Sequence, residues 1–198
     1  MIDEAVAAVR AGKTLIIPTD TVYGLCVDAY RADPAERLAR LKRRPPEMPM
    51  ALLAADVDAL FDAIPEARGR VGVIARALLP GPFTLVLPNP ARRFHWLTGT
   101  RPETIGVRVA DLPARARAVV ERAGALAATS ANFHGEPDPR RIEDIPAEIR
   151  DAAAVVLDAG ELPGTPSTVI DLTAAEPSVL REGAVPADEA LARVAAAV

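Results

Sequence analysis

The sequence predicts an α/β fold with a mixed β-sheet and flanking helices. The chain has 198 residues, of which half are apolar and a quarter charged, so it can form a sizeable core. Helical patterns alternate with short apolar runs along most of the chain, whereas strand-like runs follow one another near its end. Alternation favours parallel strands and bunching favours antiparallel ones, so we expect a mixed sheet. No repeat or long linker divides the sequence, and we expect one domain over residues 1–198.

The expected helices have recognisable ends. Gly12 suits a left-handed cap after the first helix. Asp33 is expected to cap the next helix, with Pro34 in its first turn and Glu36 reaching back. Pro80-Gly81-Pro82 closes a later one. The expected helices cover residues 3–11, 33–42, 56–64, 65–79, 113–123, 145–150 and 186–198.

Short apolar runs between these helices predict the strands. The segment 89–103, rich in Pro, Gly and Arg, is the longest expected loop. The last two strands lie close together in the sequence and are expected to be antiparallel neighbours. The expected strands cover residues 14–18, 50–54, 83–87, 104–109, 126–129, 153–157, 168–172 and 179–181.

Composition excludes several classes of protein. A net charge of −4 disfavours strong non-specific binding of nucleic acid, although a local basic cleft stays possible. Two histidines far apart and one cysteine form no metal-ligand cluster of recognisable spacing. Cys26 has no partner for an internal disulfide, which favours a reducing cytoplasm. The acidic start is unlike a signal peptide, and no apolar run reaches the ~20 residues of a membrane span.

Residues 18–25, Pro-Thr-Asp-Thr-Val-Tyr-Gly-Leu, are the most informative stretch. They follow an apolar run expected to form a buried strand, and they hold three hydroxyl groups, one carboxylate and a turn glycine. In open α/β sheets, ligands bind beyond the carboxyl ends of the strands. So many hydrogen-bonding groups exceed what a simple connection needs. The stretch predicts a binding site for a small molecule.

Lys42 and Arg44 are candidates for binding an anion. The chain has 21 Arg but only two Lys, three Ser and two Asn. Where one of these rare residue types occurs, its particular side chain is therefore more often required than at a position occupied by Arg or Ala. Arg44 precedes Pro45, which pushes its backbone toward an extended form and its side chain away from the helix. An ammonium and a guanidinium on a proline-stiffened loop suit a polyphosphate or a carboxylate. The alternative is that these cations only complement a helix C-terminus.

Other polar groups lie where expected strands begin or end. Ser130 and Asn132 follow one strand, Ser167 precedes another, and Arg181 ends a third. Arg108 lies inside a strand, where it needs either an internal carboxylate or an anionic ligand as partner. Each residue alone is as compatible with a structural role as with a functional one. Together they favour an anion site, and no Ser-His-Asp or Cys-His set indicates hydrolysis.

The ordered set of segments resembles the YrdC-like family over residues 10–185. These segments are 18–25, Lys42-x-Arg44, 80–84, 106–108, 130–132, 166–169 and 180–183. The resemblance implies a twisted α/β sheet with a concave, positively lined groove, in the short, single-domain form of the family. Cys26 stands where a glycine is common in the family, and Met48 where a polar residue is frequent.

The resemblance also implies an activity, that of threonylcarbamoyl-AMP synthase. L-Threonine, bicarbonate and ATP would give threonylcarbamoyl adenylate and pyrophosphate, and a partner complex would transfer the threonylcarbamoyl group to tRNA. Mg²⁺ would arrive with ATP, and any tRNA contact would be weak or indirect. The implied threonine site is Thr21, Tyr23, Arg108 and Ser167, with Tyr23 as a wall. The implied ATP site is Lys42, Arg44, Thr104, Ser130, Asn132 and Arg181, of which Lys42, Arg44, Ser130 and Asn132 are the expected catalytic residues.

Two alternative functions remain open on the sequence. The chain could be a sister-branch protein that acts on another carbamoylated substrate. It could also be an RNA-binding module without chemistry. Aromatic residues make up only 4% of the chain, which disfavours stacking on single strands.

Overall fold

The computed structural model describes residues 1–45 and 47–198. Pro46, part of the proline-stiffened loop expected after Arg44, lies outside the described residues. The helices are α1 (Ile2–Arg10), α2 (Ala32–Leu41), α3 (Val57–Ala63), α4 (Gly69–Leu78), α5 (Ala114–Ala123), α6 (Ala147–Ala152) and α7 (Ala187–Ala196), with short 3-10 turns η1 (His95–Leu97) and η2 (Ile142–Asp144). The strands are β1 (Leu15–Pro18), β2 (Tyr23–Asp28), β3 (Ala51–Leu53), β4 (Phe83–Pro88), β5 (Thr104–Arg108), β6 (Leu126–Ser130), β7 (Val155–Val156), β8 (Thr168–Asp171) and β9 (Ser178–Arg181).

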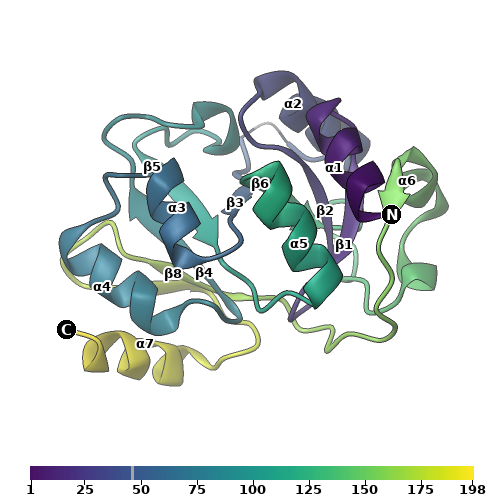
Figure 1. Cartoon of the computed structure of the whole chain (residues 1–198). Coiled ribbons are helices and arrows are strands. Elements are labelled where there is room, and N and C mark those ends of the chain that lie inside the picture. Colours follow the sequence, from purple (N-terminus) through teal and green to yellow (C-terminus); the bar gives the residue numbers. More distant parts are fainter. Residues whose placement is uncertain (46) are drawn as a thin grey trace.

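The described strands form one twisted sheet in the order β7-β1-β2-β6-β3-β5-β4-β8-β9. β1–β7, β3–β5 and β4–β8 are parallel pairs, and the other neighbours are antiparallel. The expected mixed sheet is thus confirmed, as is the antiparallel pairing of β8 with β9. Figure 1 shows α3, α4 and α7 around the β4–β8 end of the sheet and α1, α2 and α5 around the β1–β2 end.

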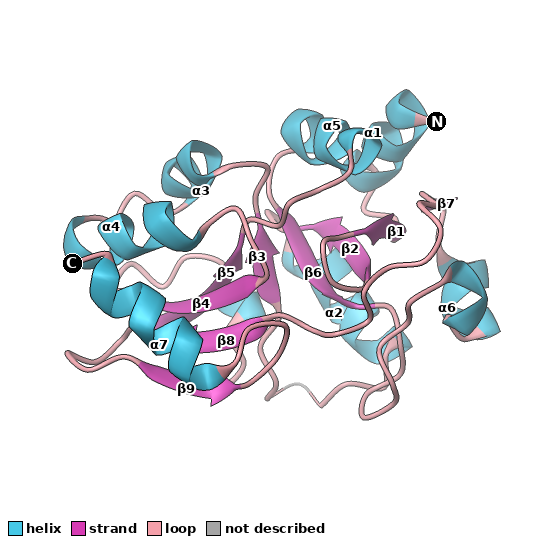
Figure 2. Ribbon diagram, turned by 90° about the horizontal axis from the view of Figure 1, so that it is seen from below, coloured by secondary structure: helices cyan, strands magenta, loops and turns pink. Residues whose placement is uncertain are grey.

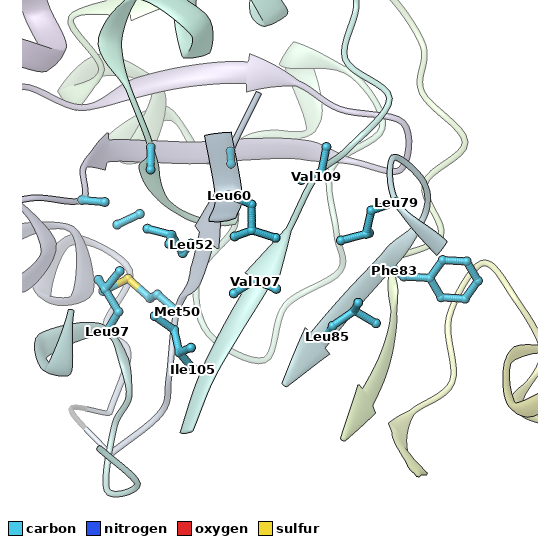
Figure 3. Close-up of a cluster of buried hydrophobic side chains, with 14 of the residues drawn as sticks. Met50, Leu52, Leu60, Leu79, Phe83, Leu85, Leu97, Ile105, Val107 and Val109 are labelled. Carbon is cyan, nitrogen blue, oxygen red and sulfur yellow. The ribbon is translucent and has the colours of Figure 1, made fainter. Parts of the chain in front are cut away.

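The helices cover the two faces of the sheet unequally. One hydrophobic cluster joins one face to α2, α3, α4, α6 and α7. Figure 3 shows part of it, where side chains of β3, β4 and β5 such as Leu52, Leu85 and Val107 meet Leu60 of α3. A smaller cluster joins the opposite face, near β1, to α1 and α5, which lie together over β1, β2 and β6 in Figure 2. The rest of that second face is left for a binding site.

The structure corrects several expected boundaries. β2 was not expected, because residues 18–25 look like a loop; Pro18 instead pairs with Tyr23 across a tight β1–β2 connection. α2 begins at Ala32, so Asp33 lies inside the first turn and accepts hydrogen bonds from Arg37 and Arg31 instead of capping. α4 begins at Gly69, four residues after the expected start. α6 covers Ala147–Ala152, two residues later than expected.

Other expected ends are confirmed. Asp56 caps α3, and its carboxylate accepts from the backbone N–H of Ala59 at 2.7 Å. Gly12 follows α1 with φ of +71°, the left-handed conformation that glycine adopts without strain. Ser130 is the last residue of β6, so the strand delivers it to the sheet's open face.

Candidate functional site

A cavity of about 390 Å³ lies on the second face of the sheet, beside the part that α1 and α5 cover. Alternate residues of a strand point to the same face, and paired residues of neighbouring strands share it. Ala51 pairs with Ala128, and Gly24 with Ser130, and all four line the cavity. Gly106 of β5 also lines the cavity. Small side chains at these positions leave the hollow.

Four arginines from three distant segments line this cavity: Arg44 after α2, Arg101 and Arg108 just before and in β5, and Arg181 at the end of β9. Burial lowers the pKa of Arg44 and Arg181, and neighbouring cations add to this effect, Arg181 on Arg44 and Arg108 on Arg181. Arginine keeps its charge at any ordinary pH, so Arg44, Arg108 and Arg181 repel one another. An anionic ligand between them would relieve that repulsion. The cavity is therefore built to bind anions.

Arg108 has an internal partner. Its Nη2 donates to the Asp20 carboxylate at 2.5 Å and to the Thr21 hydroxyl at 2.6 Å, and both charged side chains are nearly buried, 12% and 13% exposed. The backbone N–H of Asp111 donates to the other Asp20 oxygen at 3.3 Å. Of the two partners left open by the sequence, the structure supplies the carboxylate. Thr21 does not line the cavity; it holds Arg108 from behind.

Lys42 lies behind the cavity wall and orders the loop after β6. Its ammonium donates to the Ser130 carbonyl at 2.5 Å, to the Asn132 carbonyl at 2.6 Å and to Asn132 Oδ1 at 2.8 Å. These bonds use all three of its protons, and its side chain is 1% exposed. Burial lowers the pKa of Lys42 to about 8, and the nearby Arg44 cation contributes. Lys42 is thus placed to position Ser130 and does not border the cavity.

Asn132 is likewise occupied within its own loop. Its amide nitrogen donates to the carbonyls of Glu136 and Pro137 and to the Asp138 carboxylate. Its Oδ1 also accepts the Ser130 hydroxyl at 2.7 Å. Ser130 and Asp138 line the cavity, whereas Asn132 does not. The structure therefore assigns Asn132 a supporting position.

The far wall comes from β4, β8 and β9. The Ser167 and Thr84 hydroxyls lie 2.8 Å apart, and Arg181 donates to the Ser167 carbonyl at 2.8 Å. Thr104, in β5, donates to the Arg101 carbonyl. All five side chains line the cavity. They give it neutral hydroxyl groups beside its guanidinium groups.

Tyr23, which we expected as a wall of the threonine pocket, does not line this cavity. Gly24 and Cys26 face the cavity, so Tyr23, one position away in β2, faces the opposite side. Its hydroxyl lies 2.7 Å from Gly160 O and 2.9 Å from Asp158 Oδ1, the two acceptors that share its one proton. Burial raises the pKa of Tyr23 to about 12. Its role is to fix the segment after β7.

Six of the ten expected site residues thus line one cavity: Arg44, Thr104, Arg108, Ser130, Ser167 and Arg181. Lys42, Asn132 and Thr21 support them from behind, and Tyr23 lies apart. Sequence analysis did not identify Asp20 as the partner of Arg108. It also did not identify Thr84, Asp138 and the glycines of the cavity floor, Gly24 and Gly106, as lining residues. Period-two spacing in 84–86 and 104–108 was the signal that could have found part of the floor.

Cys26 and Met48, which depart from the usual family residues, both line the cavity. Burial raises the pKa of the Cys26 thiol to about 12, so it stays neutral. Among residues 1–45 and 47–198, no group of three or more His, Cys, Asp or Glu side chains is arranged to hold a metal ion. No helix in that same part of the chain is long and apolar enough to cross a membrane.

Fold and cavity together define a class, α/β proteins with a cavity lined by arginine and hydroxyl side chains on the partly open face of a mixed sheet. The family model described as "Telomere recombination", which covers the Sua5, YciO and YrdC proteins, matches residues 7–183. The chain therefore belongs to the Sua5/YciO/YrdC family.

Individual relatives agree with this assignment. The threonylcarbamoyl-AMP synthase of Stenotrophomonas maltophilia is 38% identical over 149 residues, covering 73% of this chain and 78% of the relative. The threonylcarbamoyl-AMP synthase of Pyrococcus abyssi is 32% identical over 186 residues, covering 93% of this chain but only 54% of the relative. The crystal structure of P. abyssi Sua5 complexed with L-threonine superimposes with a TM-score of 0.86 at 31% identity, over 97% of this chain and 56% of that one. The crystal structure of Escherichia coli YciO superimposes with a TM-score of 0.81 at 27% identity, over 92% of this chain and 89% of that one.

Proposed function

We propose that the chain is a threonylcarbamoyl-AMP synthase, which makes threonylcarbamoyl adenylate and pyrophosphate from L-threonine, bicarbonate and ATP. One observation carries the proposal: guanidinium groups from three distant segments meet hydroxyl groups in a single cavity. Its volume, about 390 Å³, is in the range of small-molecule sites. The relatives named as this enzyme, and the related structure complexed with L-threonine, support the substrate.

The cavity divides into two parts by the chemistry of its lining. Arg108 would bind the threonine carboxylate, since Asp20 and Thr21 already fix its guanidinium. Ser167, hydrogen-bonded to Thr84, would bind the polar groups of threonine beside it.

The other part would take ATP. Arg44, whose pKa is lowered by burial and by the neighbouring Arg181 cation, would bind phosphate oxygens together with Arg181. Ser130 and Thr104 would orient the adenylate. Lys42 and Asn132 would act through Ser130, which replaces the direct phosphate contact that the resemblance implies for Lys42.

The reaction depends on positioning the two reactants and neutralising their negative charge more than on a side-chain acid or base. The threonine amine adds to carbon dioxide derived from bicarbonate and loses a proton to solvent, which gives a carbamate. A carbamate oxygen then bonds to the α-phosphorus as the bond to the bridging oxygen breaks and pyrophosphate leaves. Both reactants are anions, so the arginines would lower the barrier by neutralising charge and aligning them.

Mg²⁺ would enter bound to the triphosphate and neutralise part of its charge. The described residues offer no cluster that would hold the ion alone. Asp138, a cavity-lining carboxylate whose charge acts on both Lys42 and Arg181, is the group placed to meet it.

The remaining parts of the proposal follow from the product. A threonylcarbamoyl adenylate is an activated acyl donor, so we propose that a separate tRNA-modifying complex consumes it, in the cytoplasm. We also propose that residues 1–198 work as a single domain.

Pyrophosphate release tests the function directly. We expect release that requires ATP, L-threonine and bicarbonate together, needs no RNA, and falls when serine replaces threonine; mass spectrometry should detect the adenylate. Arg181→Ala should lower the rate at least about tenfold, since it removes a charge-assisted hydrogen bond worth roughly 1.5–3 kcal/mol. Arg115→Ala, an exposed arginine on α5, is the matched control and should leave the rate unchanged. Release without threonine, or RNA binding with no release, contradicts the proposal.

A further inference from the structure

A second cavity, of about 550 Å³, is distinct from the proposed active site. It is lined by α3, by the segment that leads into η1 and by the turn between α5 and β6. The two cavities share none of their lining residues. Gly24 at the start of β2 borders the first, whereas Tyr30, just beyond the end of β2, borders the second. The two cavities come close at the end of β3, where Leu53 lines the first and Ala54 lines the second.

Aromatic side chains gather around this second cavity. The chain has only seven aromatic residues (four Phe, two Tyr and one Trp), and Tyr30, Phe94 and Trp96 all line it. Phe94 packs edge-on against the Tyr30 ring at 5.5 Å and against Trp96 at 6.1 Å. The Tyr30 side of the cluster is open, because Tyr30 is 53% exposed. An open aromatic surface is available to a ligand.

Tyr30 has a defined support. Gly124, with φ of +88°, lies directly against its ring, and a Cβ at Gly124 would come within 3.1 Å of Tyr30 Cε2. The Trp96 indole N–H donates to the Ala29 carbonyl at 3.0 Å. That bond fixes the indole and leaves no free N–H for an anionic ligand. The aromatic surface thus presents ring faces and edges without a hydrogen-bond donor from Trp96.

The charges around the cavity favour a cation. Asp62 and Glu121 are exposed, line the cavity and form no ion pair with any described residue. The one lining cation, Arg93, is held by the Glu66 carboxylate through two contacts of 2.9 Å. Its charge is therefore already neutralised. Two carboxylates without an ion-pair partner among the described residues, beside the exposed Tyr30 ring, repel phosphate groups and attract a positive group.

We propose that this cavity binds the guanidinium group of an arginine side chain presented by a partner protein. A guanidinium stacks flat on Tyr30 while its forked N–H groups donate to Asp62 or Glu121. A lysine ammonium lacks both the plane and the fork, so it fits less well. The proposal does not depend on the proposed function, because none of these residues lines the first cavity.

Trp96 makes the test specific, because it is the only tryptophan in the chain. The probe is N-acetyl-L-arginine methylamide, which mimics an arginine within a protein. We expect a saturable change in Trp96 fluorescence, with a dissociation constant near 1 mM that weakens as salt rises. The citrulline analogue, equal in shape but uncharged, should bind at least fivefold more weakly.

Variants separate the contribution of the carboxylates from that of the Tyr30 ring. Asp62→Asn combined with Glu121→Gln, and separately Tyr30→Ala, should each weaken the probe at least fivefold. Asp151→Asn, an exposed carboxylate on α6, is the matched control and should leave binding unchanged. The three carboxylates are exposed, so their variants should keep their unfolding temperature, whereas Tyr30→Ala loses the edge-on contact with Phe94 and should lower it slightly. Pyrophosphate release should be normal in every one.

Three results would overturn the proposal. The first is no saturable change in fluorescence up to 100-fold above the expected constant, about 100 mM. The second is equal binding of the citrulline analogue, or tighter binding of AMP, since either removes the role of the carboxylates. The third is tighter binding of free L-arginine than of the blocked derivative, which would mark an amino-acid site instead of a protein-docking site.

Discussion

Replacing Lys42 by methionine tests whether this buried lysine positions the active site or contacts the substrate. Methionine keeps most of the stem but removes the ammonium, which donates to the Ser130 carbonyl and to two oxygens of Asn132. The loop after β6 would lose its side-chain ties to the end of α2 and keep the backbone bond from the His134 N–H to the Lys42 carbonyl. Ser130 would keep its pairing with Gly24, but its hydroxyl and the Asn132 amide that accepts from it would be held less firmly at the cavity wall.

The structure lets the effects on stability and on activity be separated. Losing Lys42 leaves two backbone carbonyls without that donor, at about 1–3 kcal/mol each. Against this, burial lowers the pKa of Lys42 from 10.5 to about 8, which corresponds to about 3 kcal/mol of cost in keeping the ammonium charged. The two effects largely offset each other, so the unfolding free energy should fall by no more than about 3 kcal/mol. Displacement of the Ser130 hydroxyl should lower pyrophosphate release at least about tenfold.

The assay combines three measurements on Lys42→Met: urea unfolding, pyrophosphate release, and trypsin cleavage after Arg140 and Arg141 in the following loop. Cleavage should become faster while the protein stays folded. Lys13→Met is the matched control, because Lys13 is the other lysine of the chain and is exposed; it should change none of the three.

The result that would refute this reasoning is a selective loss of ATP affinity. If Lys42→Met weakened ATP binding tenfold but left cleavage of the loop unchanged, Lys42 would contact phosphate directly. Normal activity in the variant would also contradict the positioning role.

Three further predictions follow from the same geometry. Since the pKa of Lys42 is lowered when folded, the unfolded chain binds the extra proton between pH 8 and 10, so stability should rise with pH there by up to about 3 kcal/mol; Lys42→Met should lack this rise in urea unfolding. Tyr23→Phe removes the hydroxyl bonded to Asp158 and Gly160 and should lower the unfolding free energy by about 1–3 kcal/mol with an unchanged KM for threonine, whereas a raised KM would restore Tyr23 to the binding site. Gly106→Val puts a side chain on the cavity floor, where the closest heavy atom to a new Cβ is 3.9 Å away, so calorimetry should show weaker ligand binding without loss of the fold; full binding would place the ligand elsewhere.

The fold class followed from the sequence because helix ends and strands leave local signals. The Asp56 carboxylate caps α3 by accepting from the backbone N–H of Ala59, three residues later, so this helix start can be predicted from a four-residue segment. The apolar runs that became β4 and β5 are likewise local. β2 was missed for an equally local reason: residues 18–25 carry turn residues and hydroxyls, and their pairing with β1 and β6 comes from distant chain.

The site was predictable as a set of segments but not as a geometry. Arg44, Arg108, Ser130 and Arg181 were correctly grouped, since charged and polar groups at strand and helix ends are readable from sequence. The face of the sheet on which Tyr23 lies could not be predicted in the same way, because a shift of one residue along a strand moves a side chain to the other face.

By itself, the sequence determined a mixed α/β sheet, the family and the segments that carry anion-binding groups. Only the tertiary structure decided that Asp20 neutralises Arg108, 88 residues away, and that Lys42 holds a loop 90 residues away instead of facing the cavity. The physical reason is one of range. Helix caps and strand periodicity act between near neighbours in the chain, whereas buried charges take whichever partner the folded sheet brings within hydrogen-bonding distance.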